Sequence, residues 1–143
     1  MRKIWISKMS EWFYRGKPFN PDMAEDYVGF VYRIENLLTG KKYIGKKLFQ
    51  FSRSKKIKNS SRKRRTKITS DWLTYFGSNK YLIEDVEIHG PENFRREIIR
   101  LCTTKSECNY YEAKEQFACD AILRDDYYNQ WISLKVHRFA PSD

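Results

Sequence analysis

The chain has 143 residues, close to the most common size of a single domain. Hydrophobic residues make up 41% of it and aromatic residues 16%, so it can bury a core, which excludes global disorder. No apolar run approaches the roughly 18 residues that a membrane-spanning helix needs. The formal net charge of +10 favours a polyanionic partner such as nucleic acid.

Residues 1–26 precede the first clearly patterned segment, and we expect them to form an N-terminal extension of one domain over 27–143. The extension is basic at its start but lacks the continuous apolar segment and small-residue cleavage site of a secretory signal. The three cysteines are an odd number, which argues against a disulfide framework, and their spacing is not that of a zinc site. These features predict an intracellular protein.

The first pair of predicted strands forms a hairpin. Residues 27–34 are rich in β-branched and aromatic side chains that alternate between two faces. A Thr-Gly turn follows, and 42–45 return as a second strand. The hairpin places Tyr32 and Tyr43, eleven positions apart, on adjacent antiparallel strands.

The excess positive charge lies in one segment after this hairpin. We expect 46–54 to form a helix and a basic loop to continue to about Thr69. The segment from Lys46 to Lys67 holds eleven cations and no Asp or Glu, so it carries the whole net charge. It can be a solvated loop or a nuclear-localisation-like run, but its position favours phosphate binding, in which each neutralised phosphate releases a counterion. The residues predicted to bind nucleic acid are Lys46, Lys47, Lys55, Lys56, Lys58, Arg62, Lys63, Arg64, Arg65 and Lys67.

The rest of the chain alternates between helix and strand patterns. Residues 79–89 predict a helix that is capped by Ser78 and ends at a Gly-Pro pair. Residues 94–102 then predict a strand, and a capping box opens a helix over 104–123. The alternation over 131–136 is typical of a last strand. This order predicts a mixed α/β (α+β) domain.

Residues 29–47, GFVYRIENLLTGKKYIGKK, resemble the signature of the GIY-YIG nucleases, in which two tyrosines help a metal ion to cleave a phosphodiester. The chain departs from that signature at Phe30, where the family has its first glycine. The resemblance extends over 27–129, and DWLTYFGS…HGPENF…YYEAKEQF…DDYYN is most similar to small phage-encoded homing-type endonucleases. It implies a three-stranded antiparallel sheet flanked by helices, with the basic segment as a loop insertion.

The resemblance also implies a set of functional residues. Arg53, on the predicted helix, matches the arginine whose planar fork would bind the scissile phosphate. Glu112 matches the single metal-binding glutamate, and one carboxylate can suffice for Mg²⁺ (or Mn²⁺) because that ion keeps most of its waters. The implied catalytic residues are Tyr32, Tyr43, Arg53, Tyr75 and Asn129.

The two tyrosines have an alternative reading as buried aromatic residues of the sheet. They act as bases only if their pKa falls below the ordinary value of about 10. Nearby cations such as Lys46, Lys47 and Arg53 would lower it. Which of the two tyrosines deprotonates the attacking water stays open.

The other polar candidates have alternatives as well. Glu112 can be an ordinary exposed helix glutamate, and Glu115, one turn further on, is a competing ligand. Asn129 can bind phosphate or a metal-bound water, or it can only cap a turn.

Two function classes remain on the sequence alone. The first is a metal-dependent endonuclease that cuts DNA, expected to be double-stranded, into 5′-phosphate and 3′-hydroxyl ends. The alternative is a non-catalytic nucleic-acid-binding module, and a structural component of a ribonucleoprotein would explain the basic segment but not the hairpin. The intact set of tyrosines, arginine and glutamate favours the enzyme, with no membrane or small-molecule cofactor involved. If the chain is phage-encoded, we expect it in the host cytoplasm.

Overall fold

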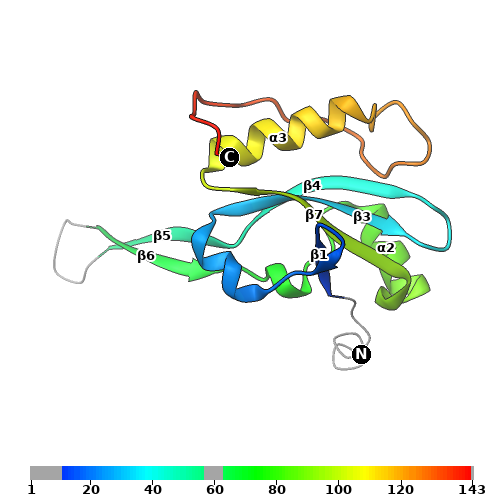
Figure 1. The fold of residues 1–143 in the computed structure, drawn as a ribbon, viewed down its shortest axis with the longest axis horizontal. Helices are drawn as coiled ribbons and strands as arrows, with labels where there is room; N and C mark the ends of the chain where they lie inside the picture. The colour runs from blue at the N-terminus through cyan, green and yellow to red at the C-terminus, as the bar shows by residue number, and fades with distance from the viewer. Residues whose placement is uncertain (1–10, 57–62, 143) are drawn as a thin grey trace.

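The computed structural model describes residues 11–56 and 63–142, and its centre is a five-stranded sheet between two helical layers (Figure 1). Helix α3 packs on one face, where Cys108 meets Val31 and Ile44. Helix α2 packs on the other, where Leu82 joins Phe30 in the main, largely aromatic core. The sheet runs in the order β2-β1-β7-β3-β4. Its strands are β1 (Trp12–Tyr14), β2 (Lys17–Pro18), β3 (Gly29–Asn36), β4 (Lys42–Leu48) and β7 (Phe94–Cys102).

The predicted tyrosine hairpin is confirmed. Strands β3 and β4 pair antiparallel, with Tyr32 opposite Gly45 and Ile34 opposite Tyr43. The turn between them uses Gly40, whose φ of +79° is a conformation that side-chain-bearing residues rarely adopt. Strand β4 is the last strand of the sheet, so side chains from both faces can reach its outer edge.

The expected three-stranded sheet is wrong in its strand number. Strands β3, β4 and β7 form the expected antiparallel part, but β1 adds to the free edge of β7 in parallel, and β2 follows it. Trp12 explains this addition because its ring is buried against Phe30 and Tyr32, and its indole Nε1 donates to the Trp72 carbonyl. An aromatic side chain of this size gains most by leaving water.

The helix predicted over 46–54 is also wrong. The chain instead continues in β4 to Leu48, turns at Phe49 and forms a separate hairpin of β5 (Gln50–Lys56) and β6 (Lys63–Thr69). Phe49 enters the core, 4.7 Å from Phe30 and 4.9 Å from Trp72 between ring centroids. The predicted basic loop is therefore largely a two-stranded hairpin that projects from the sheet (Figure 1).

Both later helices are confirmed, with adjusted ends. Helix α2 (Lys80–His89) is capped by Asn79 instead of Ser78, because the Asn79 side chain accepts from the amides of Tyr81 and Leu82. Helix α3 (Lys105–Ala118) is capped by Thr104 and ends five residues before the predicted 123. Short 3₁₀ helices occupy Pro21–Asp26, Trp72–Thr74 and Pro91–Asn93. Over the described parts of the chain, none of the helices is long and apolar enough to cross a membrane.

The predicted last strand over 131–136 is wrong, because this segment has no regular secondary structure. The C-terminal segment instead runs back along α3 (Figure 1). Its end is fixed by the buried Glu107 carboxylate, which accepts hydrogen bonds from the amide and hydroxyl of Ser142. Arg100 donates to the Ser142 carbonyl at 2.8 Å, so this anchor is made of side chains and not of a sheet ladder.

Candidate active site

A pocket of about 180 Å³ lies at the outer edge of β4. Strand β4 contributes Tyr43 from the α2 side of the sheet and Lys46 from the α3 side, and α3 contributes Glu112. An edge strand makes this possible, since a pocket around it receives residues from both faces. The residues that line the pocket are Tyr43, Lys46, Ser78, Asn79, Glu112, Gln116, Asn129, Gln130, Trp131 and Ser133.

Three predicted tyrosines meet beside this pocket. The ring of Tyr32 is 1% exposed, and its centroid lies 6.1 Å from that of Tyr43 and 5.9 Å from that of Tyr75. Gly45 makes room for them, because a Cβ at that position would lie 2.5 Å from the Tyr32 hydroxyl oxygen. The glycine of the signature is therefore required by the close approach of a phenol to the backbone.

The pKa values of Tyr32 and Tyr43 are raised and not lowered, contrary to expectation. Burial raises the pKa of Tyr32 well above its ordinary value, and electrostatic interaction and hydrogen bonding with Tyr75 raise it further. Burial also raises the pKa of Tyr43, although the hydrogen bond with Ser78 opposes this. Both phenols are consequently neutral near pH 7 in this state of the protein and can orient a water by donating or accepting a hydrogen bond.

Glu112 lies with the tyrosines as predicted. Burial raises the pKa of its carboxyl, while the charge of Lys46 and a hydrogen bond from the Lys46 backbone amide lower it. The carboxylate lines the same pocket as Tyr43, and Tyr32 is buried directly behind the Tyr43 ring. Glu115 does not line the pocket and instead accepts a weak hydrogen bond from the Cys119 thiol at 3.7 Å, so the geometry favours Glu112.

The oxygen atoms of Glu112 and Gln116 are suitable ligands for a hard divalent cation. Gln116, one helical turn further along α3, is 5% exposed, and its Oε1 has no hydrogen-bond partner among the described residues. A carboxylate and an amide oxygen are the ligand types that Mg²⁺ and Mn²⁺ prefer. The described residues contain no cluster of three or more His, Cys, Asp or Glu side chains. Any cation here would have to complete its shell with water and substrate oxygens.

Asn129 lines the pocket, and its side chain also binds the backbone of β4. Its Oδ1 accepts from the Ile44 amide at 3.0 Å and its Nδ2 donates to the Ile44 carbonyl at 2.8 Å. The Ile44 carbonyl also accepts from Gln116 Nε2 at 3.0 Å. Asn129 thereby fixes the C-terminal segment to β4 and places Trp131, which is 71% exposed, at the pocket.

Lys47 and Tyr75 form a second group on the α2 side. The Lys47 ammonium makes an ion pair with Asp71 at 2.7 Å and lies 4.0 Å above the Tyr75 ring. Arg96, which is buried, donates to the carbonyls of Leu73 and Tyr75 and so fixes the loop that carries Tyr75. Lys47 is therefore held by an ion pair, whereas the Lys46 ammonium makes none among the described residues.

Sequence reasoning missed Arg96, Gln116 and Trp131. A signal for Arg96 existed, since it alternates with Phe94 and Ile98 and so takes an inward position on β7. For Gln116 the spacing of four from Glu112 was the available signal. For Trp131 the sequence offered no signal, because its position at the pocket depends on the hydrogen bonds that the Asn129 side chain makes with β4.

The remaining predicted residues lie on the β5–β6 hairpin. Arg53 is on β5, with its backbone opposite Thr66, so its predicted place on a helix is wrong. Lys67 is exposed on β6. Lys58 and Arg62 lie outside the described residues. The other predicted cations of this hairpin, which fall on its two strands, are Lys55, Lys56, Lys63, Arg64 and Arg65.

The chain matches over residues 12–132 a family described as "Putative endonuclease segE, GIY-YIG domain". It belongs to this GIY-YIG family. The match begins at the first residue of β1, so it includes a strand that was expected to belong to an N-terminal extension. The resemblance read from the two tyrosines is thus confirmed.

A curated relative supports the same family. The chain is 32% identical over 102 residues to "Putative endonuclease segE" of Enterobacteria phage T4. The similar segment covers 70% of this chain but 39% of that relative, so the match spans well under half of the phage protein. No solved structure matches the chain.

Proposed function

We propose that this GIY-YIG domain is an endonuclease that hydrolyses phosphodiester bonds of double-stranded DNA. The observation that carries the proposal is that Tyr43 and Glu112 line one pocket at the β4 edge, with Tyr32 buried behind Tyr43. A domain that only binds nucleic acid gains nothing from a half-buried carboxylate beside a phosphate, because the two anions repel. The family membership of the chain supports the same reading.

Glu112 is the residue that would hold Mg²⁺ or Mn²⁺, with the Gln116 Oε1 atom beside it. When bound, such a cation stabilises charge on the phosphoryl oxygens and on the leaving oxygen. Lys46 adds a positive side chain at the same pocket, close enough to interact electrostatically with Glu112. Arg53 stays a proposed second cation for the scissile phosphate, reached from the start of the β5–β6 hairpin.

The two tyrosines take different proposed roles because their exposure differs. Tyr43 lines the pocket and its hydroxyl accepts a hydrogen bond from the attacking water, or passes on the proton of that water. Tyr32 is buried behind it and, together with Tyr75, fixes the ring of Tyr43. Attack of the water oxygen on phosphorus breaks the bond to the 3′ oxygen, which takes up a proton. The products are then a 5′-phosphate and a 3′-hydroxyl.

The first test is incubation of the purified chain with supercoiled plasmid in Mg²⁺, in Mn²⁺ and in EDTA. We expect nicked or linear DNA with metal and intact plasmid with EDTA, and ligation of the products by DNA ligase would identify their ends.

Glu112→Gln should abolish cleavage while DNA binding stays intact or tightens, since a like charge beside the phosphate is removed. Glu115→Gln is the matched control on the same helix and should cut normally. Cleavage by Glu112→Gln at the parental rate would refute the proposed site, and binding without cleavage by the parental chain would favour the non-catalytic alternative.

A further inference from the structure

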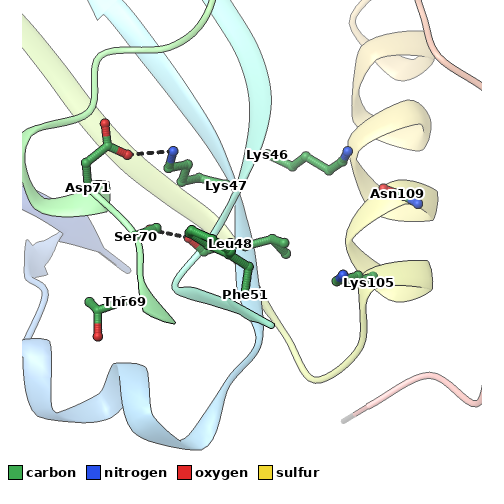
Figure 2. Close-up of a pocket in the computed structure, with 9 residues that line it drawn as sticks. All are labelled: Lys46, Lys47, Leu48, Phe51, Thr69, Ser70, Asp71, Lys105 and Asn109. Atoms are coloured by element: carbon green, nitrogen blue, oxygen red, sulfur yellow. Dashed lines mark hydrogen bonds and ion pairs between the residues drawn. The ribbon is translucent and has the colours of Figure 1, made fainter. Parts of the chain in front are cut away.

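A second and larger hollow lies next to the candidate active site, between the end of β4, the base of the β5–β6 hairpin and α3 (Figure 2). We call it the α3 groove, and its volume is about 620 Å³. Lys46 lines both the α3 groove and the candidate active site, so the two hollows meet at this residue. The residues that line the α3 groove are Lys46, Lys47, Leu48, Phe51, Thr69, Ser70, Asp71, Lys105 and Asn109.

Helix α3 connects the two hollows along one side. Lys105 and Asn109 line the α3 groove, and Glu112 and Gln116 line the candidate active site. Their spacing of four, three and four residues places all of them on one face of the helix. The α3 groove is therefore a continuation of the active site and not a separate cavity.

On its α3 side, the α3 groove holds cations that form no ion pair among the described residues. Figure 2 shows Lys47 turned toward Asp71, with which it forms an ion pair at 2.7 Å. Lys46 and Lys105 have no carboxylate within ion-pair distance among the residues that the structure describes. In the same view Lys46 extends from β4 toward Asn109 on α3. Two cations and a polar amide thus line a groove that meets the candidate active site at Lys46.

We propose that the α3 groove binds the DNA backbone on one side of the scissile bond, with Lys105 as the distal phosphate contact. The inference rests on the proposed function and extends it to Lys105 and Asn109 on α3, which lie outside the family's signature. Lys105 precedes Glu112 by seven residues, which is a rise of about 10 Å along a helix. We take α3 to lie parallel to the duplex axis, along which phosphates of one DNA strand follow each other at about 3.4 Å. Lys105 then contacts a phosphate about three nucleotides from the cut, and Lys46 contacts one between them.

The test uses short duplexes in which single phosphates are replaced, one at a time, by uncharged methylphosphonates. Binding is measured in EDTA so that no cleavage occurs, and the cut site is mapped separately with the parental chain and Mg²⁺. For the parental chain we expect weaker binding when a phosphate two to four nucleotides from the cut is neutralised, on one side only. Lys105→Ala should weaken binding of the natural duplex by about tenfold, as for the loss of a hydrogen bond to a charged group. The affinity of the Lys105→Ala chain should also no longer depend on whether that one phosphate is replaced by a methylphosphonate.

Lys114→Ala is the matched control. Lys114 is an exposed cation on the same helix, but its spacing of nine from Lys105 puts it on the opposite face. It should keep the parental affinity and the parental methylphosphonate profile, and Lys105→Arg should keep both as well. Thermal unfolding of each variant checks that α3 is intact.

Two results would overturn the inference. Lys105→Ala could bind like the parental chain, or it could bind more weakly and still respond to every methylphosphonate as the parental chain does. The second result would mean that Lys105 acts only through the general positive field of the protein. Either result leaves the proposed endonuclease intact as long as the parental chain cuts DNA. A parental chain that neither binds nor cuts would instead refute the proposed function, and the inference with it.

Discussion

Replacing Tyr43 by Phe removes the only phenol hydroxyl that lines the candidate active site among the residues that the structure describes. The ring and its packing against Tyr32 stay, and the hydrogen bond that is lost, to Ser78 at 3.4 Å, is longer than a good O–H···O bond. The free energy of unfolding should therefore fall by less than about 0.5 kcal/mol. The rate of cleavage should fall by about 10²–10⁴, the usual contribution of a group that takes part in proton transfer. That rate loss corresponds to roughly 3–5 kcal/mol of activation free energy.

Tyr32→Phe should lower stability more, and the cleavage rate less, than Tyr43→Phe does. It removes a buried hydroxyl that is hydrogen-bonded to Tyr75, which should cost about 0.5–1.5 kcal/mol of stability. Its effect on rate should be smaller than that of Tyr43→Phe, because the Tyr32 ring does not line the pocket. Tyr81→Phe, at an exposed position of α2, is the control and should change neither quantity.

The assay is the initial rate of plasmid cleavage at saturating DNA, together with binding in EDTA and thermal unfolding of each variant. Raising the pH should not restore Tyr43→Phe, since the group that would ionise is gone. The reasoning fails if Tyr43→Phe cuts at the parental rate. It also fails if Tyr32→Phe loses more rate than Tyr43→Phe, because the two roles would then be exchanged.

Three further predictions concern charge and space around the site. Burial raises the pKa of Glu112 above its ordinary 4.5, so the folded state binds the proton of this carboxyl more tightly than the unfolded state does. The free energy of unfolding that this proton contributes is therefore lost as the pH rises above about 4.5. Glu112→Gln should therefore be more stable than the parental chain at pH 7 but not at pH 4, and equal melting temperatures at both pH values would contradict this. Gly45→Ala should cost about 1–3 kcal/mol by overpacking against Tyr32 and should abolish cleavage, and a fully active, equally stable variant would show that the phenol can move aside. Removing cations from β6 should weaken DNA binding about equally for all sequences and lower the slope of log affinity against log salt by about 0.9 per lost contact; an unchanged slope would mean that this strand does not touch DNA. The residues to replace by Ala are Lys63, Arg64, Arg65 and Lys67.

The tyrosine hairpin could be predicted because its information is local. Alternation, a Thr-Gly turn and the spacing of Tyr32 and Tyr43 define two strands and their register, and the structure pairs them accordingly. The same holds for α2 and α3, whose caps are adjacent in sequence. The confirmed part of the fold is the part in which neighbouring residues decide the conformation.

The segment after the hairpin could not be predicted in this way. Its conformation depends on Phe49, which packs against Phe30 and Trp72, residues 19 and 23 positions away. Local propensity does not contain such contacts, and tertiary packing overrides it. The same applies to Trp12, whose burial against β3 turns an expected extension into a strand of the sheet.

The candidate site shows this division at the level of single side chains. The residue types that carry chemistry were visible in the sequence, since Tyr43 and Glu112 occupy positions of a known signature. Their surroundings were not, because Lys46 and Lys47 are neighbours in sequence but differ in their partners. On a strand, successive side chains point to opposite faces, so Lys47 meets Asp71 on the α2 side and Lys46 meets α3.

The edge position of β4 links the fold to the proposed chemistry. A strand in the middle of the sheet would separate the tyrosines on one face from the glutamate on the other by a full layer of backbone. At the edge, both faces open onto one pocket, and a DNA backbone can pass along the outside of the strand from the active site into the α3 groove. The C-terminal segment covers the first part of that edge, because Lys42 bonds to Asp126 and Tyr128 and both polar groups of Ile44 bond to Asn129. The edge that this segment leaves uncovered begins at Lys46, where the candidate active site meets the α3 groove.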